Sequence, residues 1–274
     1  MQALDHCLAP LSASAWPQVA WRSSGLTSRR DPVEFGFSNH DDRLRVTLEV
    51  APLETPEAER LDAALALAEA IGAPRPEAGE LAEWRALQAD HRLAWGCWLG
   101  LRQTRDGFGV KLYVEAPPDA PIVRADWRAP GARLKMIGFD LTAGVQETYF
   151  AWPRVIAEEA VARWRALGLK HTDPIVATAA ALTGLPATRA MALTDWGLSL
   201  AQAEPRLAIF LNAHAQRGGQ AAARRCLLTR PCPSYSALLG DRPDSALPDH
   251  GVVTLIPRAD GVELRVGVAA CDLV

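Results

Sequence analysis

Four cationic side chains lie at polar positions of segments in which apolar and polar residues alternate as in β-strands. They come from stretches far apart in the chain: Arg45, Lys111, Arg206 and Arg265. Guanidinium groups pair bidentately with phosphate oxygens, so convergent cations on rigid strands suit a diphosphate ligand. The sequence contains neither the GxxxxGK[ST] nor the GxGxxG phosphate loop, so a phosphate site would have to be built from such side chains.

The segment that carries the first of these cations reads as two strands joined by a polar turn. Residues 31–50 run DPVEFGFSNHDDRLRVTLEV, and the turn lies at Ser38–Asp42. Apolar residues alternate with polar ones in both arms, which is typical of half-buried strands. Glu34 and Arg45 therefore share the polar face of one predicted hairpin. A simple interpretation is that this carboxylate and this guanidinium form an ion pair.

The same pattern recurs along the chain, which predicts five hairpins with helices between most of them. The hairpins are expected near residues 32–50, 93–116, 133–152, 190–214 and 251–270. Closing about ten antiparallel strands into a barrel removes the sheet edges, and outer helices must then cover the apolar faces. We therefore predict an α+β fold, in which outer α-helices surround a barrel with a charged, solvent-filled lumen. We expect a single domain over residues 1–274 with residues 1–30 as an N-terminal cap, and a pair of smaller α+β sheets is the alternative.

Composition limits the classes of partner. The chain has 274 residues, a net charge of −3, 49% hydrophobic residues and 22% charged residues, with no basic or acidic tail. These values argue against nucleic acid or an anionic membrane as the main partner. No stretch is long and apolar enough to span a bilayer, and the N-terminus lacks the pattern of a signal peptide, so we expect a cytoplasmic protein. The five cysteines lack CxxC spacing, so we expect reduced thiols and no protein-bound metal site.

Several stretches resemble the ABBA prenyltransferases, and within them the cyanobactin-type enzymes that modify ribosomally made peptides. The first hairpin contains PVEFGFS and RLRVTLEV, the second WLGLRQTRDGFGVKLYVEAP, and the third KMIGFDLTAGVQETYFAW. The likeness extends over roughly residues 31–270 in architecture, and the matching motifs lie in these three hairpins. The chain departs from the family in having only three tyrosines, and in placing Arg265 and Gly267 where the last strand of the family tends to have aromatic residues.

The resemblance implies a prenyltransferase, which alkylates an acceptor with an isoprenyl cation released from its diphosphate. The donor would be dimethylallyl or geranyl diphosphate, which Mg²⁺ can accompany. The family's diphosphate ligands correspond to Arg45 and Lys111, and we add Arg206 and Arg265. Aromatic side chains would screen the cation from water: Tyr113, Tyr149, Trp98 and Phe210. Glu34 would hydrogen-bond the acceptor and take its proton.

The remaining acids bear on the identity of the acceptor. Several carboxylates in the predicted lumen exceed what the four cations can match once a diphosphate is bound: Glu49, Glu115, Asp140, Glu147 and Glu263. A cationic acceptor would relieve unpaired carboxylates, which favours the guanidine of an arginine in a linear or cyclic peptide over Trp or Tyr. The alternatives are that Glu49, Glu115 and Glu263 lie at strand ends in water, that the acceptor is a small aromatic or indole compound, or that the barrel binds its ligands without catalysis.

Overall fold

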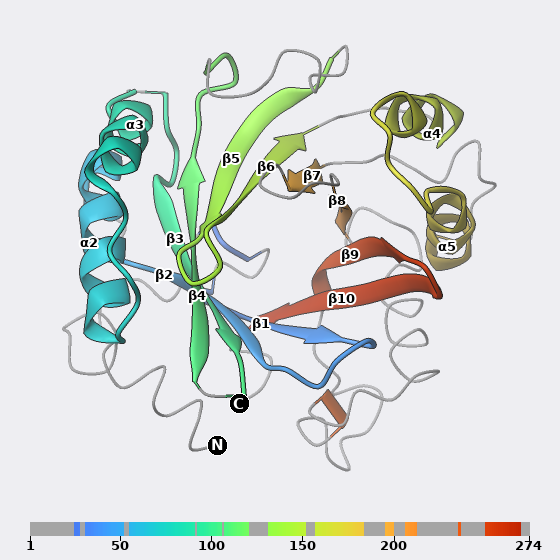
Figure 1. The fold of residues 1–274 in the computed structure, drawn as a ribbon, viewed down its shortest axis with the longest axis horizontal. Helices are drawn as coiled ribbons and strands as arrows, with labels where there is room; N and C mark the ends of the chain where they lie inside the picture. Colours follow the sequence, from blue (N-terminus) through green and yellow to red (C-terminus); the bar gives the residue numbers. More distant parts are fainter. Residues whose placement is uncertain are drawn as a thin grey trace.

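Ten antiparallel strands close into a barrel. In this computed structural model each strand is hydrogen-bonded to two neighbours, in the order β1-β10-β9-β8-β7-β6-β5-β4-β3-β2 (Figure 1). The structure describes residues 25–27, 31–51, 55–90, 92–105, 107–120, 131–151, 157–183, 195–199, 206–212, 235–236 and 250–269. The predicted closed barrel is confirmed, and the alternative of two smaller sheets is wrong.

The strands form five hairpins, as the alternation of apolar and polar residues predicts. They are β1 (Val33–Ser38) with β2 (Arg45–Glu49), β3 (Cys97–Gln103) with β4 (Phe108–Glu115), β5 (Arg133–Asp140) with β6 (Val145–Ala151), β7 (Asp195–Ser199) with β8 (Arg206–Asn212), and β9 (His250–Arg258) with β10 (Gly261–Ala269). Their positions agree with the predicted hairpins. Of the predicted N-terminal cap, only residues 25–27 belong to the described part of the chain, and a single domain over the whole chain stays a prediction.

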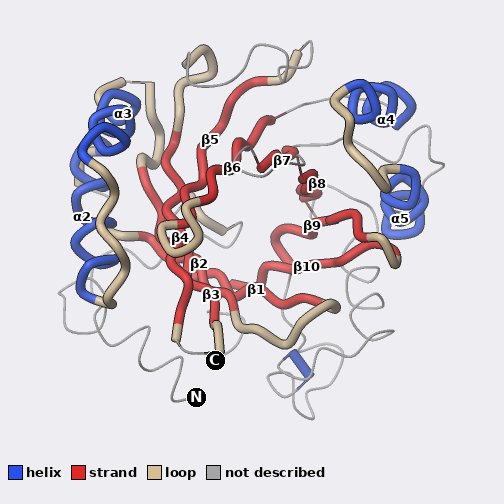
Figure 2. Tube along the Cα trace, viewed as in Figure 1, coloured by secondary structure: helices blue, strands red, loops and turns tan. Residues whose placement is uncertain are grey.

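Helices lie outside the barrel (Figure 2). They are α2 (Glu57–Ala70), α3 (Ala78–Gln88), α4 (Ala157–Ala166) and α5 (Asp173–Thr183). Helices α2 and α3 lie against the β3–β4 hairpin, whereas α5 lies against β9 and β10. The rings of Trp84 in α3 and Phe139 in β5 are 4.0 Å apart, centre to centre, so the apolar strand faces point outward to the helices. None of these described helices is long and apolar enough to cross a membrane.

Residues along the strands are alternately buried and partly exposed. In β1 the apolar Val33, Phe35 and Phe37 are buried, whereas Glu34 and Gly36 between them are partly exposed. The second half of β4 repeats the alternation. Because the helices cover the apolar face, the partly exposed residues face the barrel interior. Their exposure indicates that solvent reaches this interior, as the sequence predicts.

The barrel has two distinct ends. Strands β1, β3, β5, β7 and β9 finish at one end, where their hairpin partners begin, and we call this the turn end. The opposite end, where those strands begin, is the crossover end. Arg45 and Arg206 are the first residues of β2 and β8. The topology therefore brings these two predicted diphosphate ligands to the turn end, although they are far apart in sequence.

Candidate active site

A lysine, a carboxylate and a phenol interlock in the interior between β4 and β6. Lys111 Nζ donates a hydrogen bond to Tyr149 Oη at 2.8 Å and forms an ion pair with Glu147, and Tyr149 Oη also donates to Glu147. Lys111 Nζ lies 5.1 Å from the ring centre of Tyr113 and 5.3 Å from that of Tyr149. Burial disfavours the charged ammonium, but the neighbouring Glu147 outweighs it, so the pKa of Lys111 is raised. Lys111 is therefore a fixed positive charge in the interior.

Glycines make room for these side chains. The strand register places Lys111 opposite Gly100 of β3, and Tyr113 opposite Gly138 of β5. A Cβ atom at Gly138 would lie 2.5 Å from Lys111 Cε and 3.0 Å from Tyr149 Cε2, and one at Gly100 would lie 2.8 Å from Tyr113 Cε2. Real Cβ atoms essentially never come closer than 3.0 Å to such neighbours. Only residues without a side chain leave space for the lysine and the tyrosines at these two positions.

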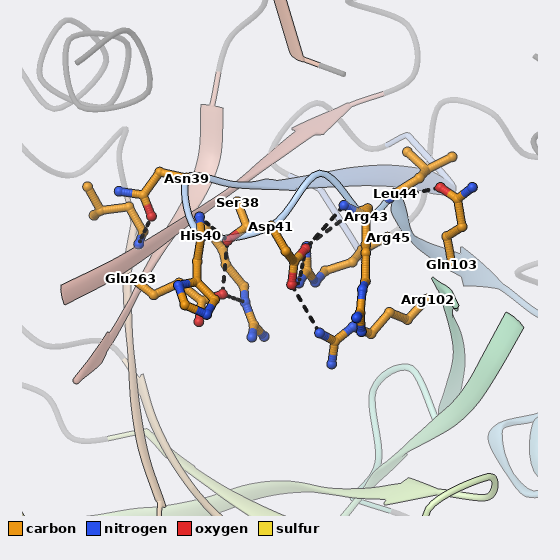
Figure 3. A network of polar contacts seen from close by, with 12 residues as sticks. Ser38, Asn39, His40, Asp41, Arg43, Leu44, Arg45, Arg102, Gln103 and Glu263 are labelled. Carbon is orange, nitrogen blue, oxygen red and sulfur yellow. Dashed lines mark hydrogen bonds and ion pairs between the residues drawn. The ribbon is translucent and has the colours of Figure 1, made fainter. Parts of the chain in front are cut away.

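An aspartate from the β1–β2 turn holds Arg45 at the turn end (Figure 3). Arg45 Nη2 donates to both carboxylate oxygens of Asp41, at 2.9 and 2.8 Å, and Arg45 Nη1 donates to the Arg43 carbonyl at 3.0 Å. Arg102 of β3 donates to the same carboxylate at 3.1 Å. Within the described part of the chain, the buried Nε of Arg45 has no hydrogen-bond partner. A buried donor without a partner is unfavourable, so this N–H is well suited to an anionic ligand.

A buried glutamate orients two further arginines at the turn end. Glu263 accepts a hydrogen bond from Arg265 Nε at 2.6 Å and another from Arg258 Nε at 2.9 Å. Ser38 Oγ donates to the same carboxylate at 2.9 Å (Figure 3). Burial would raise the pKa of Glu263, but the two guanidinium groups outweigh it and hold this pKa at about 2. Glu263 is therefore ionised at neutral pH and fixes the position of Arg265.

Three of the four predicted diphosphate ligands, Arg45, Lys111 and Arg265, contribute positive charge to the same part of the interior. Burial and then Arg265 lower the pKa of Arg45. Burial would raise the pKa of Glu147, but Lys111 and, less strongly, Arg265 lower it. The strand register agrees for the two arginines, because Arg265 pairs with Ser38 of β1 and Arg45 pairs with Gly36, two residues earlier on the same strand. The fourth predicted ligand, Arg206, begins β8 at the turn end, and its side chain lies outside the described part of the chain.

Glu34 faces the interior from β1 without a hydrogen-bond partner among the described residues. The register places it opposite Thr47 of β2 and Ala269 of β10, neither of which carries a charge. Burial raises the pKa of Glu34 to about 7. The simple ion pair of Glu34 with Arg45 does not form, because Arg45 pairs with Asp41. A carboxyl group that titrates near neutral pH is suited to exchange a proton during a reaction.

Two of the acids assigned to the acceptor instead fasten the crossover end. Glu49 forms an ion pair with Arg60 of α2 at 3.2 Å, and both side chains are only 2% exposed. Glu115 accepts hydrogen bonds from the backbone N–H groups of residues 94–96, at 2.6 to 3.0 Å. The first contact joins a helix to the barrel, and the second shapes the loop that leads into β3. Both contacts hold the fold together.

The other two acids assigned to the acceptor also have partners. Asp140 accepts hydrogen bonds from the N–H groups of Thr142 at 3.0 Å and Ala143 at 2.8 Å, which shapes the β5–β6 turn. Glu147 is paired with Lys111. All four acids assigned to the acceptor therefore have partners in the described part of the chain, and the identity of the acceptor stays a prediction.

Aromatic rings line part of the interior. Tyr149 lies 5.9 Å from Tyr113 and 5.4 Å from Phe210, ring centre to ring centre. Trp98 of β3 stacks on Trp95, with ring centres 3.7 Å apart and planes at 14°. Trp95 was missed by the sequence analysis, and the available signal was its spacing from Trp98 in WGCW. The three-ring cluster offers the π surface that a carbocation needs for screening.

Three charged residues of the turn end were also missed. Asp41 was predicted only as part of a polar turn. Arg102 lies near the end of β3, and Arg258 is the last residue of β9. The register places Arg102 directly opposite Arg45. Strand alternation would have put Arg102 in the interior once the pairing of β2 with β3 was known.

Cationic side chains, rather than clusters of acids, characterise the described site. Within the described ranges, no group of three His, Cys, Asp or Glu side chains is arranged to hold a metal ion. Cys97 is a free, buried cysteine, and burial raises the pKa of its thiol. The other four cysteines lie outside the described residues. What the site presents to a ligand is therefore positive charge, aromatic surface and one titratable carboxyl group.

Comparison with known proteins gives a fold. No family model matches the sequence, and no curated protein matches it. The prenyltransferase PriB, solved with L-tryptophan and dimethylallyl thiolodiphosphate, is 16% identical with a TM-score of 0.73, over 99% of this chain and 89% of PriB. The 5-dimethylallyl tryptophan synthase from Streptomyces coelicolor, solved with DMASPP and Trp, is 18% identical with a TM-score of 0.70, over 100% of this chain and 88% of the synthase. AnaPT from Neosartorya fischeri is 12% identical with a TM-score of 0.67, over 98% of this chain and 88% of AnaPT. The protein has the fold of these structures, which is the barrel of the ABBA prenyltransferases.

Proposed function

We propose that this protein is a prenyltransferase, which moves a short isoprenyl group from its diphosphate to an acceptor in the barrel interior. One observation carries the proposal: cations, aromatic rings and a carboxyl group that titrates near neutral pH face the same interior. Lys111 represents the first, Tyr149 the second and Glu34 the third. The fold supports the proposal, since PriB is a prenyltransferase that was solved with a thiolodiphosphate and tryptophan.

Donor activation falls to the cations. The diphosphate would accept hydrogen bonds from Lys111, from the partnerless Nε of Arg45 and from Arg265, with Arg206 as a fourth ligand. As the bond between the allylic carbon and oxygen breaks, its electron pair leaves with the diphosphate, and these charges stabilise the leaving group. The allylic cation then lies against the interior aromatic rings, which screen it from water.

The acceptor supplies the electrons for the new bond and loses a proton to Glu34. Because the other acids are paired, we take an indole, as free tryptophan or in a peptide, ahead of an arginine side chain. The N–H of an indole could donate to Glu34, an interior carboxylate without a hydrogen-bond partner among the described residues, and the synthase from Streptomyces coelicolor was solved with Trp. Arginine is the second candidate, because a guanidinium would neutralise Glu34 if it bound beside it.

The test is a transfer assay with defined donors and acceptors. The purified protein is incubated with dimethylallyl or geranyl diphosphate and with tryptophan or with linear and cyclic peptides containing Trp, Tyr or Arg. Products are identified by mass, and the modified atom is located by tandem mass spectrometry. We expect dimethylallylated indole, and we expect turnover to persist in EDTA because cationic side chains rather than Mg²⁺ would neutralise the diphosphate.

Other outcomes of this assay separate the alternatives. Modification of arginine alone would replace the indole acceptor with the second candidate. A requirement for Mg²⁺ would add the ion to the donor complex. Binding of dimethylallyl thiolodiphosphate without transfer to any acceptor would identify a binding protein built on this barrel and would overturn the proposed activity.

A further inference from the structure

The carboxylate of Glu34 rests directly against a glycine of the neighbouring strand. A Cβ atom at Gly267 of β10 would lie 2.8 Å from Glu34 Oε1, and closer still to Cδ and Oε2. Real Cβ atoms essentially never approach a neighbour within 3.0 Å, so with any other residue at this position either the carboxylate or the strand would have to move. The observed position of the Glu34 carboxylate therefore depends on the absence of a side chain at Gly267.

Glycine is needed at position 267 for the space that it leaves and not for its φ angle. Glycine is often needed where φ is positive, but Gly267 is not among the residues of the described chain with positive φ. It pairs with Gly36 in the β1–β10 ladder, whereas its pairing with β9 falls at a register shift between Val266 and Val268. The three heavy atoms nearest to a Cβ atom at Gly267 all belong to the Glu34 side chain.

No polar contact among the described residues holds Glu34 in place. Its carboxylate has no hydrogen-bond partner there, and its cross-strand neighbours Thr47 and Ala269 are uncharged. The shape of the wall beneath it is the remaining constraint on where its oxygens lie. The same contact with β10 contributes to the burial that raises the pKa of Glu34 to about 7.

We infer that Gly267 is a positioning residue for Glu34. The space left by the absence of a side chain at Gly267, which we call the seat, determines where the carboxylate lies relative to the acceptor. The inference rests on the proposed function for the role of Glu34, but the seat itself is a property of the structure.

The test replaces Gly267 by alanine and measures the pKa of the Glu34 carboxyl group directly. In Gly267→Ala we expect the carboxyl pKa of Glu34, measured by ¹³C NMR on glutamate-labelled protein and assigned with Glu34→Gln, to fall from about 7 toward its ordinary value. Turnover should fall by about 100-fold, the effect of a misplaced catalytic group, while affinity for dimethylallyl thiolodiphosphate is unchanged. The matched control is Gly109→Ala on β4, where an added Cβ atom would meet nothing closer than 3.8 Å, and which should change none of these values.

A double-mutant cycle shows whether the effect passes through Glu34. In the Glu34→Gln background, Gly267→Ala should cause little further loss of turnover, because the base is already absent. If Gly267→Ala fails to fold, Glu34→Ala/Gly267→Ala should fold, since the clash is gone, and failure of both would overturn the inference. A folded Gly267→Ala protein with unchanged Glu34 pKa and unchanged turnover would overturn it as well. A wild-type protein without transfer activity would refute the proposed function and still leave the NMR measurement to decide the seat.

Discussion

Two walls of the barrel interior hold their carboxylates in opposite ways. On the donor wall, formed by β4–β6 together with Arg45 and Arg265, Glu147 is bonded to Lys111 and Tyr149, and its pKa is lowered because the lysine and its hydrogen bonds outweigh burial. On the acceptor wall, formed by Glu34 of β1 and the uncharged residues that face it, Thr47, Gly267 and Ala269, Glu34 has no hydrogen-bond partner among the described residues, and burial raises its pKa to about 7. Burial acts to raise the pKa of both groups, so the partner decides the ionisation. A fixed charge suits binding, whereas a group whose proton can move suits catalysis.

Glu34→Gln should disable the acceptor wall and leave the donor wall intact. The amide keeps the shape of the side chain but cannot take a proton, so turnover should fall by about 100- to 10,000-fold. Single-turnover assays with product quantified by mass spectrometry measure this loss. A variant with near wild-type turnover would show that Glu34 is only a buried strand residue.

Glu49→Gln makes the same substitution at a carboxylate that has a partner. It removes one charge of a buried ion pair, so the free energy of unfolding should fall by about 3–5 kcal/mol. Turnover per folded molecule should not change, since this ion pair joins a helix to the barrel. Urea unfolding followed by circular dichroism gives the stability. Lost turnover with unaltered stability would move Glu49 into the active site.

Gly138→Ala should disturb the donor wall without changing any charge. The added Cβ atom would displace Lys111 Cε, from which it would lie 2.5 Å. Affinity for the thiolodiphosphate should fall by about tenfold, less than the loss of a whole charge-assisted contact. Gly109→Ala, on the same strand as Lys111, is the control. Equal affinities of the two variants would contradict a seat for Lys111 at Gly138.

The smallest expected effect is a pH dependence of stability. The folded-state pKa of Glu34, about 7, lies above the ordinary value of 4.5, so the native state keeps a proton that the unfolded chain releases. Stability should therefore fall as the pH rises from about 4.5 to about 7, and level off above it. Glu263, with a pKa of about 2, has the opposite sign and costs stability only in acid. Urea midpoints of the wild type minus those of Glu34→Gln isolate the first effect, and a pH-independent difference would contradict it.

Strand alternation was sufficient to predict the barrel and the interior faces. It put Glu34, Arg45 and Lys111 inside, because a period of two follows from local backbone geometry. It could not predict which interior charges are paired, because partners come from elements distant in sequence. Glu49 pairs with Arg60 of α2, Glu115 accepts hydrogen bonds from the loop before β3, and Asp140 accepts them from the β5–β6 turn.

The site was predictable in its residue types but not in its contacts. Asp41 looked like an ordinary turn residue, yet it holds Arg45 with two hydrogen bonds. The role of Gly267 is also invisible in sequence, because it depends on where the Glu34 side chain lies in space. Such contacts emerge only when the strand register and the side-chain directions are both known.

Calorimetric titration of dimethylallyl thiolodiphosphate tests the division between the two walls most directly. Lys111→Ala and Arg45→Ala should each weaken binding by about 1.5–3 kcal/mol, the value of a hydrogen bond to a charged group, while Glu34→Gln should bind as tightly as the wild type. Circular dichroism confirms that all three variants are folded. Unchanged affinity in both cation variants, or a loss in Glu34→Gln as large as theirs, would contradict the account.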